Sequence, residues 1–445
     1  MTVNKSISHS PFIPFDPNVA MYNTSYGHLT PWEYSGWKAE SLSWKNGCYL
    51  HAGLNPNLKY RLTGPDVMRL LKDSCINDFR KFSVGATKHG VMCNENGNVM
   101  ADGLILRTAE DEFICMGHGP YLDFLIDSGR YDVSKEDQDK STFLFQLAGP
   151  RSLAVAEAVT GESLRDIEFF WHRPSQIRRV DGKGDIPVRI FRVGVARTLA
   201  YEIHGHVEDV EAVYAAVMEA GRKFEIERLG MQAYGLNHTE GGMVQLYIHF
   251  LPAWIEDRAF MDSLPEAYSS IMTNLHGSAG SDPAKRFANP VEVNWGHMIT
   301  FDHEFTGSAA LKDAMAAPRR KTVTLEWNEA DVLDIYASQF RPGDDAEFMD
   351  FIANPVWQGF MAATFCDDVM VGHDLIGMSS GRMFSHYHRK MISLAVIDVK
   401  AADIGNEVDV IWGKPGTNQK RIRARVARMP YIDRPFNNDI DTKLI

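Results

Sequence analysis

Residues 58–71, with the sequence LKYRLTGPDVMRLL, contain a strand-like stretch that leads through Gly64 and Pro65 into apolar residues at helical spacing. Proline is favoured in the first turn of a helix, so a helix is expected to begin here. The same order of features returns in residues 143–158, FLFQLAGPRSLAVAEA. The sequence therefore predicts two similar α+β units within the first three hundred residues.

Two other segments have clear local patterns. Residues 93–98, CNENGN, form a turn-rich cluster between two apolar stretches, and this order is typical of a β-hairpin. In residues 208–221 the apolar positions recur every three or four residues, which predicts an amphipathic helix.

The pattern changes near Pro318. In residues 322–327 and 421–426, apolar and polar residues alternate, which is the spacing of a strand with two different faces. We therefore expect a boundary at this proline. Residues 319–445 are predicted to form a mostly-β domain, either a barrel or a sandwich.

Composition excludes several classes of protein. The 445 residues include 46 Lys and Arg against 58 Asp and Glu, a net charge of −12, which disfavours nucleic acid and anionic membranes as partners. The five cysteines form no C-x-x-C pair, and residues 1–20 hold no apolar core of signal-peptide length. The longest weakly polar run, residues 356–366, is far shorter than a membrane span. These features predict a cytoplasmic protein without disulfides.

Most short motifs give no firm assignment. The chain contains no P-loop, no dinucleotide-binding glycine motif and no H-E-x-x-H. Two histidine pairs, His204-Gly205-His206 and His386-Tyr387-His388, have no obvious third ligand, so no metal site is predicted. Ser379 lies in a G-x-S-x-G motif, but the alternating strand pattern around it disfavours a serine hydrolase.

Residues 231–243, MQAYGLNHTEGGM, concentrate a phenol, an imidazole and a carboxylate beside two glycines. If Tyr234 and His238 lie on one helix, their spacing of four places both on the same face. Composition alone slightly favours ordinary packing for this pair over a role in proton transfer.

Several segments follow one another in a fixed order along the chain: Tyr60-Arg61-Leu62-Thr63-Gly64-Pro65-Asp66, Asn94-Glu95-Asn96-Gly97 with Asp102, Phe145-Gln146-Leu147-Ala148-Gly149-Pro150, Tyr201-Glu202-Ile203, Phe301-Asp302-His303-Glu304-Phe305-Thr306-Gly307 and Gly405-Asn406-Glu407-Val408 with Pro430-Tyr431. Together they resemble the tetrahydrofolate-dependent methyltransferase family that includes the T-protein of the glycine cleavage system. Two further segments, Trp32-Glu33-Tyr34-Ser35-Gly36-Trp37 and Gln232-Ala233-Tyr234, carry a closer likeness to the bacterial aromatic O-demethylases that act on vanillate, syringate, dicamba and similar methoxybenzoates. The resemblance implies an α+β fold of three domains in a clover-leaf, with tetrahydrofolate in a central channel within residues 1–318 and a β-barrel in residues 319–445.

The resemblance also implies roles for individual residues. Glu202 matches the glutamate that holds the pteridine ring, since a carboxylate accepts two parallel N–H bonds. Tyr234 matches a catalytic tyrosine, and we expect either Tyr234 or His238 to donate a proton to the departing aryl oxygen. The other expected folate contacts are Gln146, Phe169, Met116, Met243 and Asp102. The expected substrate contacts are His118, Tyr247, His249, Asn55 and Tyr26.

The expected reaction is methyl transfer from a methoxylated aromatic acid to N5 of tetrahydrofolate, which gives the phenol and 5-methyltetrahydrofolate. The chain departs from the family in two places: His118 stands where the vanillate enzyme has an arginine, and residues 53–57 replace its histidine-rich loop. The substrate pocket is therefore expected to differ. An amine or sulfonium demethylase of the same fold, or a folate-binding protein without activity, stays open, as does the oligomeric state.

Overall fold

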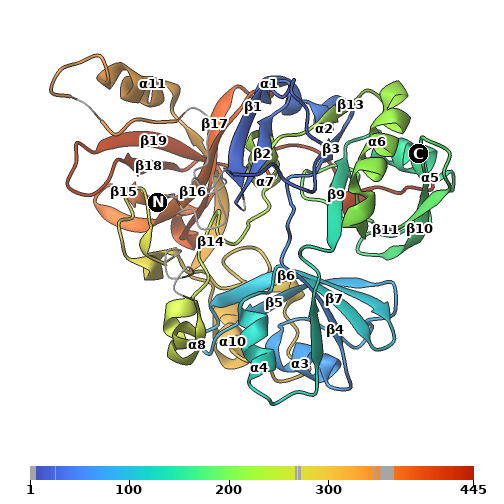
Figure 1. Ribbon diagram of the computed structural model, residues 1–445. Coiled ribbons are helices and arrows are strands. Elements are labelled where there is room, and N and C mark those ends of the chain that lie inside the picture. The colour runs from blue at the N-terminus through green and yellow to red at the C-terminus, as the bar shows by residue number, and fades with distance from the viewer. Residues whose placement is uncertain (1–6, 26, 266–267, 269–271, 345, 351–364) are drawn as a thin grey trace, which may run out of the picture.

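The computed structural model describes residues 7–25, 27–265, 268, 272–344, 346–350 and 365–445. Its strands form two open sheets, one closed barrel and an N-terminal hairpin. Figure 1 shows three lobes around a common centre, one lobe for each open sheet and one for the barrel. The predicted α+β clover-leaf with a β-barrel is confirmed.

The six-stranded sheet and the helices α5 (Ser152–Thr160) and α6 (Val210–Gly221) form one lobe. The predicted strand and helix of residues 143–158 are β9 and α5, and the predicted helix of residues 208–221 is α6, so all three are confirmed. In sheet order the strands are β10 (His172–Arg178), β11 (Asp185–Phe191), β12 (Ala200–His206), β9 (Thr142–Ala148), β3 (Cys48–His51) and β13 (Ile226–Arg228).

The five-stranded sheet forms a second lobe with the helices α3 (Val67–Ser74), α4 (Tyr121–Asp127), α8 (Arg258–Ser263) and α10 (Ser308–Ala316). Its chain segment lies between β3 and β9, so the two open sheets are interleaved in sequence. The predicted hairpin is β5–β6, and residues 58–71 are strand β4 and helix α3, as expected. In sheet order the strands are β5 (Thr87–Cys93), β6 (Val99–Ala109), β7 (Glu112–Met116), β4 (Lys59–Thr63) and β8 (Ser134–Asp137).

The barrel closes because its first strand pairs with strands on both sides, β17 and β19. Helix α11 (Glu329–Ser338) follows the first strand. The inward-facing residues of the strands form an apolar core that includes Trp327 and Trp412. In barrel order the strands are β14 (Arg320–Trp327), β17 (Lys390–Asp398), β16 (Asp374–Ser385), β15 (Cys366–Val371), β18 (Glu407–Trp412) and β19 (Lys420–Ala427).

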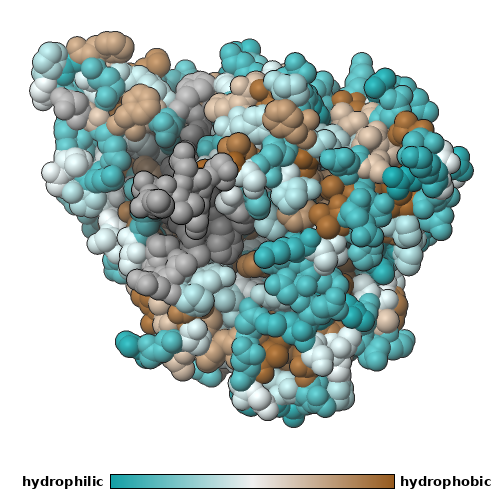
Figure 2. Space-filling view, viewed as in Figure 1, coloured by the Kyte–Doolittle hydropathy of each residue, from teal (hydrophilic) through white to brown (hydrophobic). Residues whose placement is uncertain are grey.

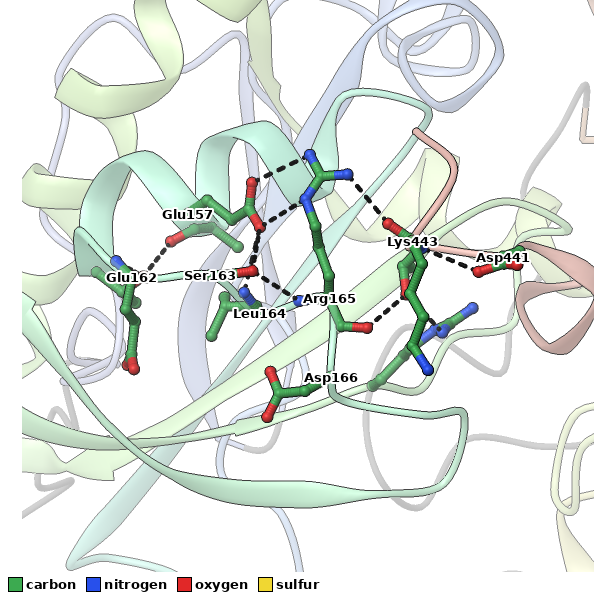
Figure 3. Close-up of polar contacts among 12 residues, drawn as sticks. Glu157, Glu162, Ser163, Leu164, Arg165, Asp166, Asp441 and Lys443 are labelled. Carbon is green, nitrogen blue, oxygen red and sulfur yellow. Dashed lines mark hydrogen bonds and ion pairs between the residues drawn. The ribbon is translucent and has the colours of Figure 1, made fainter.

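After β19 the chain leaves the barrel and ends against the lobe of the six-stranded sheet (Figure 1). Arg165 and Thr442 exchange two hydrogen bonds, from the guanidinium to the Thr442 carbonyl at 3.1 Å and from the Thr442 hydroxyl to the Arg165 carbonyl at 3.0 Å. Figure 3 shows Arg165 between Glu157 of α5 and this C-terminal segment. The tail therefore connects two lobes that are far apart in sequence.

An N-terminal unit lies between the barrel and the six-stranded sheet (Figure 1). It consists of β1 (Met21–Ser25), β2 (His28–Glu33), α1 (Trp37–Glu40) and α2 (Ser43–Asn46), and helix α7 (Met231–Gly241) contacts β2, α1 and the barrel strand β16. On the face seen in Figure 2, small hydrophobic patches lie between hydrophilic residues. In the described part of the chain, no helix combines the length and the apolar character needed to cross a membrane.

Candidate active site

A cavity of about 280 Å³ is lined by residues from both open sheets. A small apolar cluster that includes Leu106 and Met116 of one sheet and Leu144 and Phe191 of the other joins the same two sheets. The residues that line the cavity are Ser25, Leu54, Pro56, Asn57, Leu58, Asp102, Gly103, Leu104, Met116, Gly117, Gly119, Leu144, Glu202, Gln245, Leu246, Tyr247 and Ile248.

Strand alternation turns Glu202 toward this cavity. Its neighbours Tyr201 and Ile203 lie in the core that the sheet shares with α5 and α6, so the side chain between them points to the opposite face. Glu202 is the register partner of Gln146 on β9, and Gln146 is in turn the partner of His51 on β3. Register partners share a face, so the three side chains form a polar row across the sheet.

The inner end of the row is buried. The hydroxyl of Tyr49 donates to Oε1 of Gln146 at 2.6 Å, and Nδ2 of Asn237 donates to the same hydroxyl at 3.0 Å. The ring of His51 stacks on the ring of Tyr234, with centroids 4.2 Å apart and an angle of 5° between the planes. The row therefore leads from Glu202 at the cavity to Tyr234 on α7.

Glu202 itself is held by a neighbour on its own strand. Nε2 of His204 lies 2.9 Å from Oε2 of Glu202, and the two residues are 8% and 6% exposed. Lys59 is also buried nearby, and its amine donates to the hydroxyl of Thr142 at 3.0 Å. Burial lowers the pKa of Lys59 to about 8, although the charge of Glu202 acts in the opposite direction.

Asp102 supplies the second carboxylate of the cavity, from strand β6 of the other sheet. Its Oδ2 lies 2.8 Å from Nε2 of His89 on β5. The ring of His89 packs edge-on against Trp295 at 4.9 Å. The cavity thus has one carboxylate on each sheet, and each carboxylate has a histidine partner.

Tyr247 lines the cavity from the segment after α7 and has a φ of 68°. This left-handed conformation is strained for a bulky residue and is often found at functional sites. Two backbone hydrogen bonds within the same turn hold it. The Tyr247 amide donates to the Phe250 carbonyl at 2.8 Å, and the His249 amide donates to the Gln245 carbonyl at 2.9 Å. The turn presents Tyr247 to the cavity.

Tyr234 and His238 lie on one face of α7, as their spacing predicts, with ring centroids 5.3 Å apart. Both are buried, but neither is among the residues that line the cavity. Burial lowers the pKa of His238 to about 4, so its imidazole is neutral at pH 7. Of the two candidate proton donors, the neutral state of His238 favours Tyr234.

Helix α7 is fixed at its C-terminal end. A buried ion pair joins Nζ of Lys45 on α2 to Oε2 of Glu240 at 2.5 Å, and the hydroxyl of Ser385 on β16 donates to the other oxygen of Glu240. The hydroxyl of Thr239 donates to the Gly381 carbonyl of the barrel at 2.8 Å. The position of Tyr234 therefore depends on the N-terminal unit and on the barrel.

Two of the expected substrate contacts, His118 and His249, lie behind the cavity wall, next to the lining residues Gly117 and Ile248. Nε2–H of His118 donates to the Gly90 carbonyl at 3.0 Å, and Nδ1 of His249 accepts from the Gln245 amide at 3.0 Å. Burial lowers the pKa of His118 to about 4 and that of His249 to about 3. Neither imidazole is a cation at pH 7.

Three further predicted residues lie outside the cavity lining. Asn55 exchanges hydrogen bonds with the backbone of Leu144, at 2.6 and 3.0 Å, so its amide serves the loop between the sheets. Phe169 stacks on Phe170 and contacts Phe436 of the C-terminal tail edge-on. Met243 follows the end of α7, where its amide donates to the His238 carbonyl. Tyr26 lies outside the described residues.

The G-x-S-x-G motif is not a nucleophile turn. Ser379 is buried within the antiparallel strand β16, and its hydroxyl lies 2.7 Å from that of Ser393. A hydrolase would place this serine on a turn between a strand and a helix. Of the histidine pairs, His204 binds Glu202, and the described part of the chain holds no group of three His, Cys, Asp or Glu side chains arranged for a metal.

Comparisons with known proteins identify the class. Residues 17–248 match the family model described as "GCVT N-terminal domain". The chain is 41% identical over 434 residues to a sesamin methylene transferase of Sinomonas sp. (strain No.22), covering 95% of this chain and 94% of that one. It is 28% identical to a syringate O-demethylase of Sphingobium sp. (strain NBRC 103272 / SYK-6), covering 90% and 89%.

The fold has a counterpart among solved structures. The glycine cleavage system aminomethyltransferase T from Bartonella henselae superposes with a TM-score of 0.67 at 15% sequence identity, covering 94% of this chain and 96% of that chain. The chain belongs to the GCVT family. It is a tetrahydrofolate-dependent methyltransferase with the predicted T-protein-like fold.

The residues around the cavity suit a reduced folate. Glu202 offers a carboxylate oxygen for the amino and ring N–H groups of a pterin, and Leu54, Leu104, Leu144 and Met116 offer apolar walls. The predicted folate residues Glu202, Asp102 and Met116 line the cavity, as does the predicted substrate residue Tyr247. Gln146 lies behind Glu202 in the row. His89 has no sequence motif that points to the site. His204 lies two residues from Glu202 on one strand, a spacing that indicates a shared face, but the His-x-His pattern alone suggests only a metal ligand.

Proposed function

We propose that this protein transfers a one-carbon unit from the oxygen of an uncharged aryl ether to tetrahydrofolate held at Glu202. The observation that carries the substrate class is the charge of the cavity. Two carboxylates line it, and among its described lining residues there is no Lys or Arg. The buried histidines behind the wall are neutral at pH 7. Lys59, the buried amine near Glu202, lies outside the lining, so its charge acts on Glu202 from behind the cavity wall. A carboxylated substrate would therefore meet two carboxylates in a lining that offers it no cation of its own.

The relatives support an aryl ether as donor. One is named for sesamin, a neutral lignan with methylenedioxy groups on its rings, and the other for syringate, a methoxybenzoate. The charge of the cavity favours a neutral aryl ether, such as a methylenedioxy arene, over the methoxybenzoates expected from the sequence. Methoxybenzoate demethylation is the second candidate, and the syringate relative is its support.

In both reactions the folate supplies the nitrogen nucleophiles. Transfer of a methyl group breaks one C–O bond, forms one C–N bond and moves one proton from nitrogen to the aryl oxygen. Transfer of a methylene group breaks two C–O bonds, forms two C–N bonds at N5 and N10 and moves two protons to the catechol oxygens. The protein has to align these atoms and supply proton carriers near the aryl oxygen.

We assign Tyr234 as the proton donor to the aryl oxygen. Its support is its place at the inner end of the polar row, stacked on His51, together with the low pKa of His238. Glu202, Asp102 and Met116 are assigned to the folate, and Tyr247 to the substrate. Because Tyr234 is outside the cavity lining, this assignment requires the ether oxygen to reach the end of the row.

A substrate panel tests the proposal. Purified protein and tetrahydrofolate are incubated without oxygen with neutral methylenedioxy and methoxy arenes, with their benzoate analogues, and with an amine and a sulfonium donor. We expect catechol and 5,10-methylenetetrahydrofolate, or phenol and 5-methyltetrahydrofolate, from the neutral ethers. Turnover of the benzoates alone favours the second candidate. Folate binding without turnover of any donor contradicts both and favours a binding protein.

A further inference from the structure

The two carboxylates of the cavity share an arrangement that the proposed reaction does not explain by itself. Glu202 of one sheet and Asp102 of the other each contact one imidazole of their own sheet, at 2.9 and 2.8 Å. In the six-stranded sheet the partner is two residues along the same strand. In the five-stranded sheet it lies on the neighbouring strand β5.

The direction of both hydrogen bonds follows from the chemistry. A carboxylate only accepts, so Nε2 of His204 and Nε2 of His89 carry the hydrogen. Burial lowers the pKa of His204 below its ordinary value, which keeps that imidazole neutral at pH 7. Each histidine therefore donates one bond to one carboxylate oxygen.

The histidine bonds use only one oxygen of each carboxylate. Among the described residues, none donates a hydrogen bond to Oε1 of Glu202 or to Oδ1 of Asp102, and both side chains line the cavity. A carboxylate anchored at one oxygen has a restricted orientation, so less entropy is lost when a ligand N–H binds the other. Hydrogen bonds with an ionised partner are also the strong ones.

We infer that His204 and His89 are positioning residues, which hold Glu202 and Asp102 with one oxygen presented to N–H groups of the folate. The inference rests on the proposed folate site. It adds two residues that contact neither folate nor substrate and act only through the carboxylates.

Tetrahydrofolate binding to the full chain, measured by titration calorimetry without oxygen, tests the inference. Leu at position 204 or 89 removes the donated bond, and Gln keeps an N–H near the position of Nε2. We expect His204→Leu and His89→Leu to weaken binding about tenfold and the Gln variants to restore it to within about threefold. With the aryl donor, His204→Leu is expected to raise the KM for folate with little change in kcat.

Controls separate this result from general damage. His206 lies on the same strand, two residues beyond His204, and is exposed, so His206→Leu is expected to bind folate like the unchanged protein. If a Leu variant does not fold, His204→Asn or His89→Asn replaces it, because the shorter amide cannot reach the carboxylate.

The Glu202→Gln variant separates a failure of the proposed folate site from a failure of the roles inferred for the two histidines. If Glu202→Gln weakens binding but the Leu and Asn variants of both histidines bind normally, the positioning roles are overturned and the folate site stands. If Glu202→Gln binds folate normally, the proposed folate site is wrong. Equal loss in the Leu and Gln variants of a histidine would also overturn its role as a hydrogen-bond donor.

Discussion

Ser379 in the barrel and Glu202 on the inner face of the six-stranded sheet are both buried polar residues, but their hydrogen bonds are satisfied differently. In the barrel, Ser379 bonds Ser393, and Ser393 also accepts from the indole of Trp327 at 2.9 Å. On the sheet, Glu202 has one oxygen bound by His204 and the other open to a cavity. Polar groups whose bonds are completed inside the protein hold the fold together, whereas those left open at a cavity are candidates for binding.

The largest expected effect comes from breaking a buried ion pair whose charges are satisfied inside the protein. Lys45 and Glu240 form a buried ion pair with side chains 0% and 1% exposed. Lys45→Met would leave the Glu240 charge buried without its cation, which costs about 3–5 kcal/mol. Urea unfolding measures the loss, with the exposed Lys183→Met as the control at about 0.5 kcal/mol or less. A loss below about 1 kcal/mol for Lys45→Met would show that the pair does not anchor α7.

The next effect concerns the open carboxylate. Glu202→Gln keeps the shape of the side chain but replaces one acceptor oxygen by an N–H donor, which would repel the N–H groups of a pterin bound at the proposed site. We expect tetrahydrofolate to bind about a hundredfold more weakly, with a free energy of unfolding within about 1 kcal/mol of the original. Calorimetry and urea unfolding measure the two quantities. Normal folate binding combined with a loss of stability would make Glu202 a structural residue like those of the barrel.

A smaller effect is expected where the C-terminal tail supports the sheet. Asn437 is fully buried; its Nδ2 donates to the Ala200 carbonyl at the start of β12, and its Oδ1 accepts from Arg192. Asn437→Ala leaves the Arg192 and Ala200 groups without these partners and should cost about 1–3 kcal/mol in urea unfolding. Because β12 carries Glu202, folate binding is expected to weaken severalfold. Unchanged stability would show that the tail is dispensable for this strand.

The smallest effect is expected at Ser379. Ser379→Ala removes one hydrogen bond within the barrel and should cost about 1 kcal/mol, without any change in folate binding or turnover. A fluorophosphonate probe is expected not to label the protein. Labelling at Ser379, or loss of turnover in this variant, would contradict the structural role given to the motif.

Local patterns were sufficient for much of the fold. The Gly-Pro helix starts at residues 64–65 and 149–150, the turn at residues 93–98 and the alternation in residues 421–426 each specify their element through nearby residues. The C-terminal tail could not be predicted in this way. Its contacts with Arg165 and Arg192 join segments more than two hundred residues apart, and no local period encodes them.

The site was predicted in part for the same reason. Glu202 follows from a motif on a single strand, but its alignment with Gln146 and His51 depends on the register of three strands. Asn55 is a plausible ligand residue in the sequence, but in the fold its amide donates to the Ala52 and Leu144 carbonyls and accepts from the Leu144 amide. The charge of the buried histidines depends on burial, which only the folded chain shows.

The central claim is that the cavity between the two open sheets holds reduced folate against Glu202. A crystal structure of the protein soaked with tetrahydrofolate without oxygen tests this most directly. We predict the pterin amino and ring N–H groups within about 3 Å of the Glu202 carboxylate, with the His204 bond preserved. A pterin bound elsewhere, or a Glu202 side chain turned away from it, would contradict the claim.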